Sequence, residues 1–168
     1  MTLIALRRQP DGAWKMARVI GLLEERSKVV KNRCAMPTII DVALAFVERI
    51  NGHDVNGLVA LMTEDHRFVD GLGQTVRGRK QMEKGWASYF GWFPDYSITV
   101  EDILSKGNAV GLFGTAQGTY SVNGELLPKN RWQIPAAWKA VVLDGRISDW
   151  RVYTDNEPVW KIMGVKRY

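Results

Sequence analysis

Residues 61–71, with the sequence LMTEDHRFVDG, constrain the fold most, because an amphipathic helix ends there and strand-like alternation begins. Side chains alternate between the two faces of a strand, so His66, Phe68 and Asp70 share one face. If that face lines an enclosed apolar cavity, Asp70 loses solvation and becomes a candidate proton-transfer group. Alternatively, Asp70 caps the turn that follows it and His66 is hydrogen-bonded at the rim.

The charge of the chain is concentrated at its N-terminal end. The 168 residues carry a net charge of +5, and residues 1–35 account for all of it, with eight Lys and Arg against three acidic residues. The remaining residues carry 15 basic and 15 acidic side chains. No interleaving of basic and aromatic residues accompanies the basic segment, so we expect no nucleic-acid partner.

The few cysteine and histidine residues restrict the chemistry. Cys34 is the single cysteine, so no intrachain disulfide is expected, which fits a cytoplasmic location. His53 and His66 form no metal-binding doublet, so we expect neither a metal nor another cofactor. Charged residues interrupt the most apolar stretch, residues 39–50, well short of a membrane span, and the N-terminus lacks the pattern of a signal peptide.

Hydrophobic periodicity predicts helices first and an antiparallel meander afterwards, which is an α+β layout. We expect a β-hairpin at residues 2–20, a basic helix or linker at 21–35, helices at 39–50, 55–62 and 79–90, strands at 96–104, 109–121, 131–143 and 146–153, and a short last helix over 159–163. Residues 1–35 therefore form an extension and residues 36–168 the main domain. Residues 11–20 share four identities with residues 144–153, so the extension is either the remnant of an upstream copy or unrelated.

Two features predict a cavity inside this domain. One face of the strand at residues 109–121 carries Leu112, Gly114, Ala116 and Gly118, and small residues on the concave side of a bent sheet leave empty volume. The helix at residues 79–90 presents a stripe of rings, and a core with many rings often leaves a crevice between them.

The element order, together with residues 58–70 and 144–155, resembles the nuclear transport factor two-like superfamily, and within it the SnoaL-like and ketosteroid-isomerase-like proteins. The resemblance implies a cone-shaped α+β barrel, with a strongly curved antiparallel sheet wrapped around three helices, and homodimers that pair through the outer sheet face. It places Asp70 where steroid isomerases have their general base, and His66, on the same strand face, is the second candidate catalytic residue. The expected substrate-binding residues are Phe46, Phe68, Trp86, Tyr89, Phe90, Leu112, Trp132, Trp138, Trp150 and Val152.

Several catalytic positions of the superfamily are occupied by other residue types. Phe46 stands where steroid isomerases have a tyrosine, and the acid of their third meander strand falls near Trp138. The arginine and aspartate of epoxide hydrolases fall near Gly114 and Ala116. Val152 replaces an aspartate used by both epoxide hydrolases and polyketide cyclases, so we expect no epoxide hydrolase activity. Asp70 remains as a base, with His66, Tyr89 or a tryptophan N–H as the donor.

These observations support three functional hypotheses. The first is a cytoplasmic homodimer that binds a small apolar, cyclic, polyketide- or steroid-like molecule, with isomerase-, cyclase- or dehydratase-like proton transfer that needs no cofactor. The second is a non-catalytic ligand-binding or accessory protein of the same fold. The third is a protein–protein scaffold that uses the N-terminal hairpin as an added strand or swapped arm.

Overall fold

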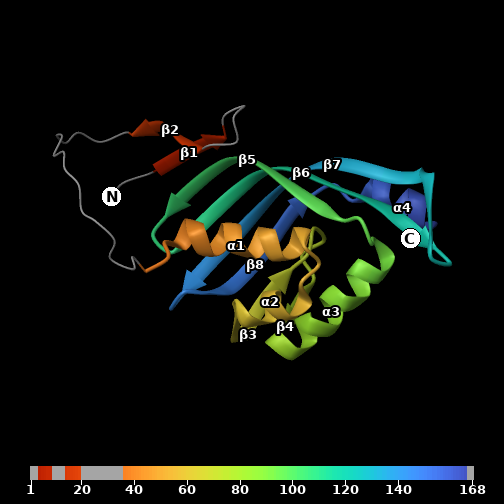
Figure 1. Cartoon of the computed structure of the whole chain (residues 1–168), viewed down its shortest axis with the longest axis horizontal. Coiled ribbons are helices and arrows are strands. Elements are labelled where there is room, and N and C mark those ends of the chain that lie inside the picture. The colour runs from red at the N-terminus through yellow and green to blue at the C-terminus, as the bar shows by residue number, and fades with distance from the viewer. Residues whose placement is uncertain (1–3, 9–13, 20–35, 166–168) are drawn as a thin grey trace.

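The computed structural model describes residues 4–8, 14–19 and 36–165, and within them an eight-stranded sheet and four helices. The strands are β1 (Ile4–Arg8), β2 (Trp14–Val19), β3 (Met62–Val69), β4 (Thr75–Arg77), β5 (Ser97–Lys106), β6 (Ala109–Val122), β7 (Glu125–Leu143) and β8 (Arg146–Thr154). The helices are α1 (Ile39–Asn51), α2 (Val55–Ala60), α3 (Arg79–Trp92) and α4 (Glu157–Met163). Figure 1 shows the long strands β5–β8 arching over α1, with α2 and α3 on the same concave side.

The sheet has the order β2-β1-β5-β6-β7-β8-β3-β4. Neighbouring strands are antiparallel, apart from the parallel pair β3 and β8. The predicted α+β class with a strongly curved sheet is confirmed. The sheet is open rather than a closed barrel, since β2 and β4 are its edges, and α4 is a fourth helix at the end of β8.

Helix α1 forms where the sequence predicts it, because capping residues define both ends. The Thr38 hydroxyl accepts a hydrogen bond from the Asp41 amide, and the Asp41 carboxylate accepts one from the Thr38 amide. Gly52 follows the last turn. The buried face of the helix comprises Val42, Ala43, Phe46, Val47 and Ile50, and it packs onto the concave side of the sheet.

The switch from α2 to β3 occurs earlier than predicted. Met62 was expected to end the helix, but it is the first residue of β3 and is fully buried. The Ile147 amide donates to the Leu61 carbonyl at 2.7 Å, and Met62 pairs with Ile147 of β8. Tertiary pairing with β8 therefore overrides the helical periodicity at this point.

The meander strands are longer than predicted, and each of the three connections between them spans two residues. Asn123 and Gly124 have φ angles of 52° and 84°, and Asp144 and Gly145 have φ angles of 48° and 72°, as two-residue hairpin turns require. Strand β7 begins at Glu125, six residues before the predicted start. The second strand of each hairpin therefore follows its turn directly.

The small residues of β6 differ in their roles. A Cβ atom on Gly114 would lie 2.0 Å from the Thr99 carbonyl oxygen, so Gly114 is required by the close backbone approach at the β5 bulge. A Cβ on Gly118 would lie 3.2 Å from the Trp132 ring. Of these small residues only Ala116 lines the cavity. Gly114 therefore allows close packing of the β5 backbone and Gly118 allows close packing of the Trp132 ring, and neither glycine adds to the cavity.

The N-terminal hairpin extends the sheet within the same chain. Strand β1 pairs antiparallel with β2 on one side and with β5 on the other, where Ile4 pairs with Ser105. The predicted turn of this hairpin, the basic segment 21–35 and Cys34 lie outside the described residues.

Candidate functional site

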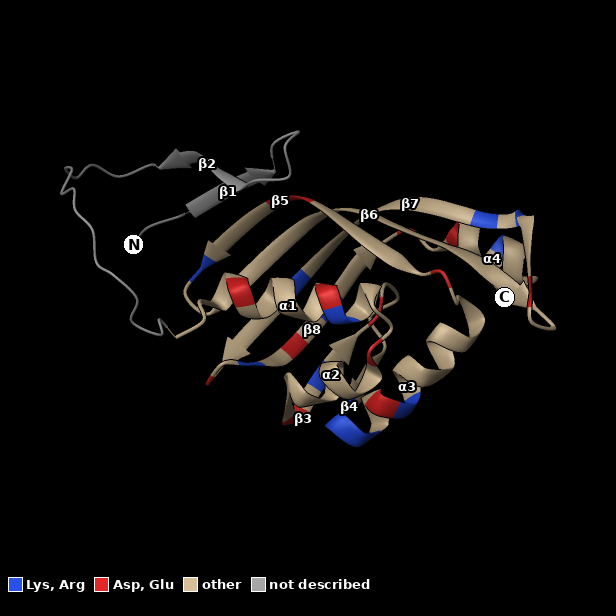
Figure 2. Ribbon diagram, viewed as in Figure 1, with Lys and Arg blue, Asp and Glu red and all other residues tan. Residues whose placement is uncertain are grey.

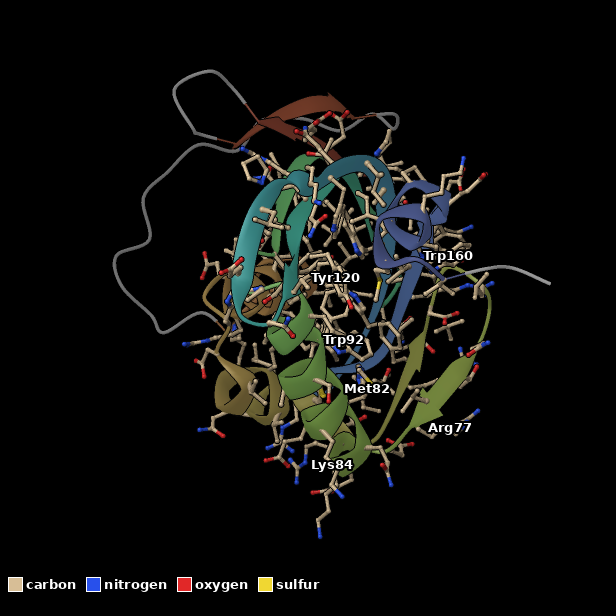
Figure 3. The ribbon with its side chains drawn as sticks, turned by 90° about the vertical axis from the view of Figure 1, so that its right-hand side faces the viewer. Arg77, Met82, Lys84, Trp92, Tyr120 and Trp160 are labelled. Atoms are coloured by element: carbon tan, nitrogen blue, oxygen red, sulfur yellow. The ribbon has the colours of Figure 1, made fainter. Side chains whose placement is uncertain are left out.

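A cavity of about 280 Å³ lies between α3, the inner face of β6–β8 and the turn that joins β3 to β4. It is lined by Phe68, Asp70, Gly71, Val76, Gln81, Met82, Gly85, Trp86, Tyr89, Tyr96, Ala116, Trp132, Ile134, Ala136, Trp138, Trp150, Val152, Thr154 and Asn156. Figure 3 looks at this end of the molecule, with Met82 on α3 directed toward the strands behind it and Trp160 on α4 to one side. Gly71, Val76, Gln81 and Gly85 are exposed and form the rim.

Aromatic rings form a continuous wall along one side of the cavity. The ring centroids of Phe68 and Trp86 lie 6.4 Å apart at an interplanar angle of 70°. Trp86 meets Tyr89 at 6.0 Å and 89°, Tyr89 meets Tyr96 at 4.9 Å and 88°, and Tyr96 meets Trp132 at 6.0 Å and 40°. Three of the four contacts are therefore edge-to-face, an arrangement that aromatic quadrupoles favour.

Two periodicities place these side chains. On α3, Met82, Trp86 and Tyr89 follow the i, i+4, i+7 spacing of one helix face. On β7, Trp132, Ile134, Ala136 and Trp138 alternate onto the inner face of the sheet. Ala136 is the small member of this series, so hollow space remains between the helix and the strand.

Asp70 is half-buried just beyond the end of β3, and it serves the turn and the cavity at once. Its Oδ1 atom accepts hydrogen bonds from the amides of Leu72 at 2.9 Å and Gln74 at 2.8 Å. No residue in the described part of the chain donates to Oδ2 or forms an ion pair with this carboxylate. The turn-capping placement and the cavity-lining placement are therefore compatible.

His66 shares the strand face with Asp70 but is sealed in the core outside the cavity lining. Its Nδ1 atom lies 2.8 Å from the Ile147 carbonyl oxygen, which can only accept, so Nδ1 carries the proton. Nε2 is then an unprotonated acceptor, and it is buried without a partner among the described residues. Burial lowers the pKa of His66. The ring is therefore neutral and has no N–H to offer a ligand in the cavity.

Tyr89 and Tyr96 place two neighbouring hydroxyl groups in the cavity wall. Their hydroxyls are hydrogen-bonded to each other, and burial raises the pKa of both groups. Both remain neutral O–H donors over the ordinary pH range. The indole Nε1 atoms of Trp86 and Trp132 are buried and have no partner among the described residues.

The structure brings seven of the predicted substrate-binding residues together around the cavity. They are Phe68, Trp86, Tyr89, Trp132, Trp138, Trp150 and Val152. Phe46, Phe90 and Leu112 are buried in the core and do not line it.

Sequence reasoning missed other lining residues. Tyr96, Ile134, Ala136 and Met82 lie in the wall, and Gln81, Thr154 and Asn156 add polar groups. Alternation along residues 131–143 would have placed Ile134 and Ala136 beside Trp132 and Trp138. Nothing in the local sequence pattern distinguishes these three polar residues from ordinary surface residues.

Charged groups lie mainly outside the cavity. Figure 2 shows Lys, Arg, Asp and Glu on the outside of α1 and at the first turn of α3, whereas β6 carries no charged residue. Asp70 is the one side chain of the lining with a formal charge at neutral pH. Within the described ranges, no cluster of His, Cys, Asp and Glu has the geometry to hold a metal ion. None of the described helices has the length and apolar character to cross a membrane.

Comparisons with known proteins place this geometry in a family. The family model described as a SnoaL-like domain matches residues 43–150, and none of the curated proteins matches the chain.

Among solved structures, a protein of ketosteroid-isomerase-like fold from Catenulispora acidiphila, in complex with trimethylamine, is 20% identical, with a TM-score of 0.64 over 74% of this chain and 93% of that one. A candidate SnoaL-like polyketide cyclase from Jannaschia sp. CCS1 is 20% identical, with a TM-score of 0.66 over 82% of this chain and 100% of that one. An LEH-like epoxide hydrolase from M. tuberculosis is 21% identical, with a TM-score of 0.62 over 74% and 87% of the two chains. The chain belongs to the SnoaL-like domain family.

Proposed function

We propose that this protein binds a small, cyclic, largely apolar molecule in the cavity between α3 and the sheet. The observation that carries the proposal is the ring-lined space of about 280 Å³. Small-molecule sites have volumes of about 300–1,000 Å³ and combine apolar walls with a few polar groups. Thr154, Asn156 and Asp70 supply such groups around an otherwise apolar wall.

The same cavity holds groups suited to proton transfer without a cofactor. The free Oδ2 atom of Asp70 is a base that can remove a proton from a carbon next to a ligand carbonyl and return it to another carbon. When the Tyr96 oxygen accepts the hydrogen bond that it shares with Tyr89, the Tyr96 O–H can donate to the carbonyl oxygen. This chemistry is isomerase- or cyclase-like.

Binding is tested by quenching of tryptophan fluorescence with 1-tetralone and with 4-androstene-3,17-dione. Ala136→Leu places three extra carbon atoms in the cavity and is expected to abolish binding. Ala137→Leu is the matched control, because the next residue on β7 faces the other side of the sheet. Equal binding by the native protein and Ala136→Leu would place the ligand elsewhere.

Proton transfer is tested by the exchange of the α-protons of 1-tetralone in D₂O, followed by NMR. Asp70→Asn is expected to stop the protein-catalysed exchange. The asparagine oxygen can still accept the amides of Leu72 and Gln74, so the turn is retained. An unchanged exchange rate would remove Asp70 from the chemistry.

A carrier without turnover is the second candidate function. The observation that favours it is the engagement of Asp70 Oδ1 by two turn amides, which gives the carboxylate a structural role. Phe46, Trp138 and Val152 occupy positions at which members of the superfamily carry catalytic groups, and none of the three side chains can act as an acid or a base. This candidate predicts saturable binding of the same probes with no exchange in either the native protein or Asp70→Asn.

We also propose that two copies pair through the outer face of the sheet, in the cytoplasm. Leu104, Phe113 and Tyr153 are exposed there around a shallow groove, and exposed apolar patches mark interaction surfaces. Analytical ultracentrifugation of the native chain is expected to give a dimer, and Phe113→Glu a monomer. A native monomer would contradict this arrangement.

A further inference from the structure

We propose that the ligand of this cavity carries an alkylated ammonium group, which lies against the aromatic wall and whose charge Asp70 balances. The proposal rests on ligand binding in the cavity and adds the chemical class of the ligand. It follows from the ring geometry, the charge of the lining and the absence of strong hydrogen-bond acceptors on Phe68, Trp86 and Trp132.

The first step is the ring geometry. The face of an aromatic ring carries negative potential, and a cation is attracted to a ring face when it lies within about 6 Å of the centroid. The Trp86 and Tyr89 rings meet at an interplanar angle of 89°, and the Tyr89 and Tyr96 rings meet at 88°. Neighbouring ring planes in this wall are therefore nearly perpendicular. Trp132 continues this wall. A cation in the cavity can therefore lie close to more than one aromatic ring.

The second step is the charge of the lining. Asp70 is half-buried in the rim, and no Lys, Arg or His side chain lines the cavity. Among the described residues, no cation forms an ion pair with Asp70. An anionic ligand would meet both the carboxylate and the ring faces with unfavourable electrostatics. A cationic ligand supplies the positive charge that no described residue places beside the Asp70 carboxylate.

The third step concerns which cation fits. A primary ammonium has three N–H donors, and each buried donor without an acceptor costs free energy. Phe68, Trp86 and Trp132 offer aromatic carbon and two indole N–H donors but no strong acceptors. Alkyl groups on the nitrogen remove these donors and add apolar surface. A tertiary or quaternary amine therefore suits the cavity better than a free –NH₃⁺ group.

The test compares choline with 3,3-dimethylbutan-1-ol, which has the same shape but carries carbon in place of the charged nitrogen. Both are titrated against the native protein at constant ionic strength, with tryptophan fluorescence and calorimetry as readouts. We expect choline to bind about ten-fold more tightly than the alcohol, since cation–π contacts and the carboxylate favour the charge.

Two pairs of variants locate the effect. Asp70→Asn is expected to remove most of the preference for choline over the alcohol. Glu83→Gln removes one acidic group from the exposed side of α3, outside the lining, and is expected to leave the preference intact. Phe68→Leu is expected to reduce the preference, whereas Phe113→Leu on the outer face is expected to have no effect.

The possible results separate this inference from the proposed function. Equal affinities for choline and the alcohol, in the native protein and in Asp70→Asn, would overturn the ammonium inference and leave the cavity as an apolar site. The same conclusion follows if only 1-tetralone binds. If neither the cyclic ketones nor choline binds, both the proposed function and this inference are wrong.

Discussion

His66 and Asp70 lie at opposite ends of one strand face, and a different helix packs against each end. His66 lies under α1, with its ring 6.2 Å from the Phe46 ring, and it is fully buried outside the cavity lining. Phe68 and Asp70, two and four residues later, lie beside α3 and line the cavity. Trp86 stands at the boundary, 6.4 Å from both Phe46 and Phe68. The cavity therefore begins where the cover by α1 ends.

This difference shows that one strand face can serve stability at one end and binding at the other. At the core end, the ring of Phe46 packs 4.8 Å from that of Trp150, and close packing leaves no room for a ligand. At the cavity end, Trp150 also forms part of the wall. The floor of the site is thus a rigid part of the core, which preorganises the cavity for its ligand.

The largest expected effect comes from removing a ring at each end. Phe46→Ala deletes a fully buried ring and is expected to lower the free energy of unfolding by about 3–5 kcal/mol. Phe68→Ala removes a half-buried ring that already borders empty space, and is expected to cost about 1 kcal/mol. Denaturant unfolding of both variants measures the difference. Equal losses would mean that the cavity end is as tightly packed as the core end.

The next effect is the pH dependence that His66 contributes. Burial lowers its pKa in the folded state below the unfolded value of about 6.5, so the unfolded chain binds more protons over the pH range between the two values. The free energy of unfolding is therefore expected to fall as the pH decreases below about 6.5, by at most about 1.4 kcal/mol per pH unit from this group.

Urea unfolding at several pH values measures this slope in the native protein and in His66→Gln. The variant is expected to be less stable at pH 7 but to lose this part of the slope. A slope that is unchanged in His66→Gln would assign the pH dependence to other groups.

Elements with local signals were predictable from the sequence. The bounds of α1 follow from Thr38 and Gly52, and the turn pairs Asn123-Gly124 and Asp144-Gly145 required positive φ angles that few other residue pairs adopt. The early start of β7 was not predictable, because residues 125–130 contain Pro128 and polar residues that are typical of a loop.

The candidate site was only partly predictable, because periodicity identifies a face but not what covers it. His66 and Asp70 share a strand face, but only Asp70 lines the cavity. Tyr89 and Phe90 are neighbours on α3, but only Tyr89 lines it. Phe90 stacks on His53 at 4.4 Å instead. Such differences depend on the relative positions of α1, α3 and the sheet, which no local pattern encodes.

The smallest effect concerns the turn at the cavity end. Asp70→Ala removes the acceptor for the Leu72 and Gln74 amides, and is expected to lower the free energy of unfolding by about 1 kcal/mol, since these amides are then solvated by water. Asp70→Asn keeps an acceptor oxygen and is expected to change stability by less than about 0.5 kcal/mol. Thermal unfolding measures both variants, and ligand titrations on the same samples separate the structural role of Oδ1 from the functional role of Oδ2. If Asp70→Asn destabilises the fold as much as Asp70→Ala, the charge itself holds the turn, and loss of binding in Asp70→Asn would report a disturbed rim.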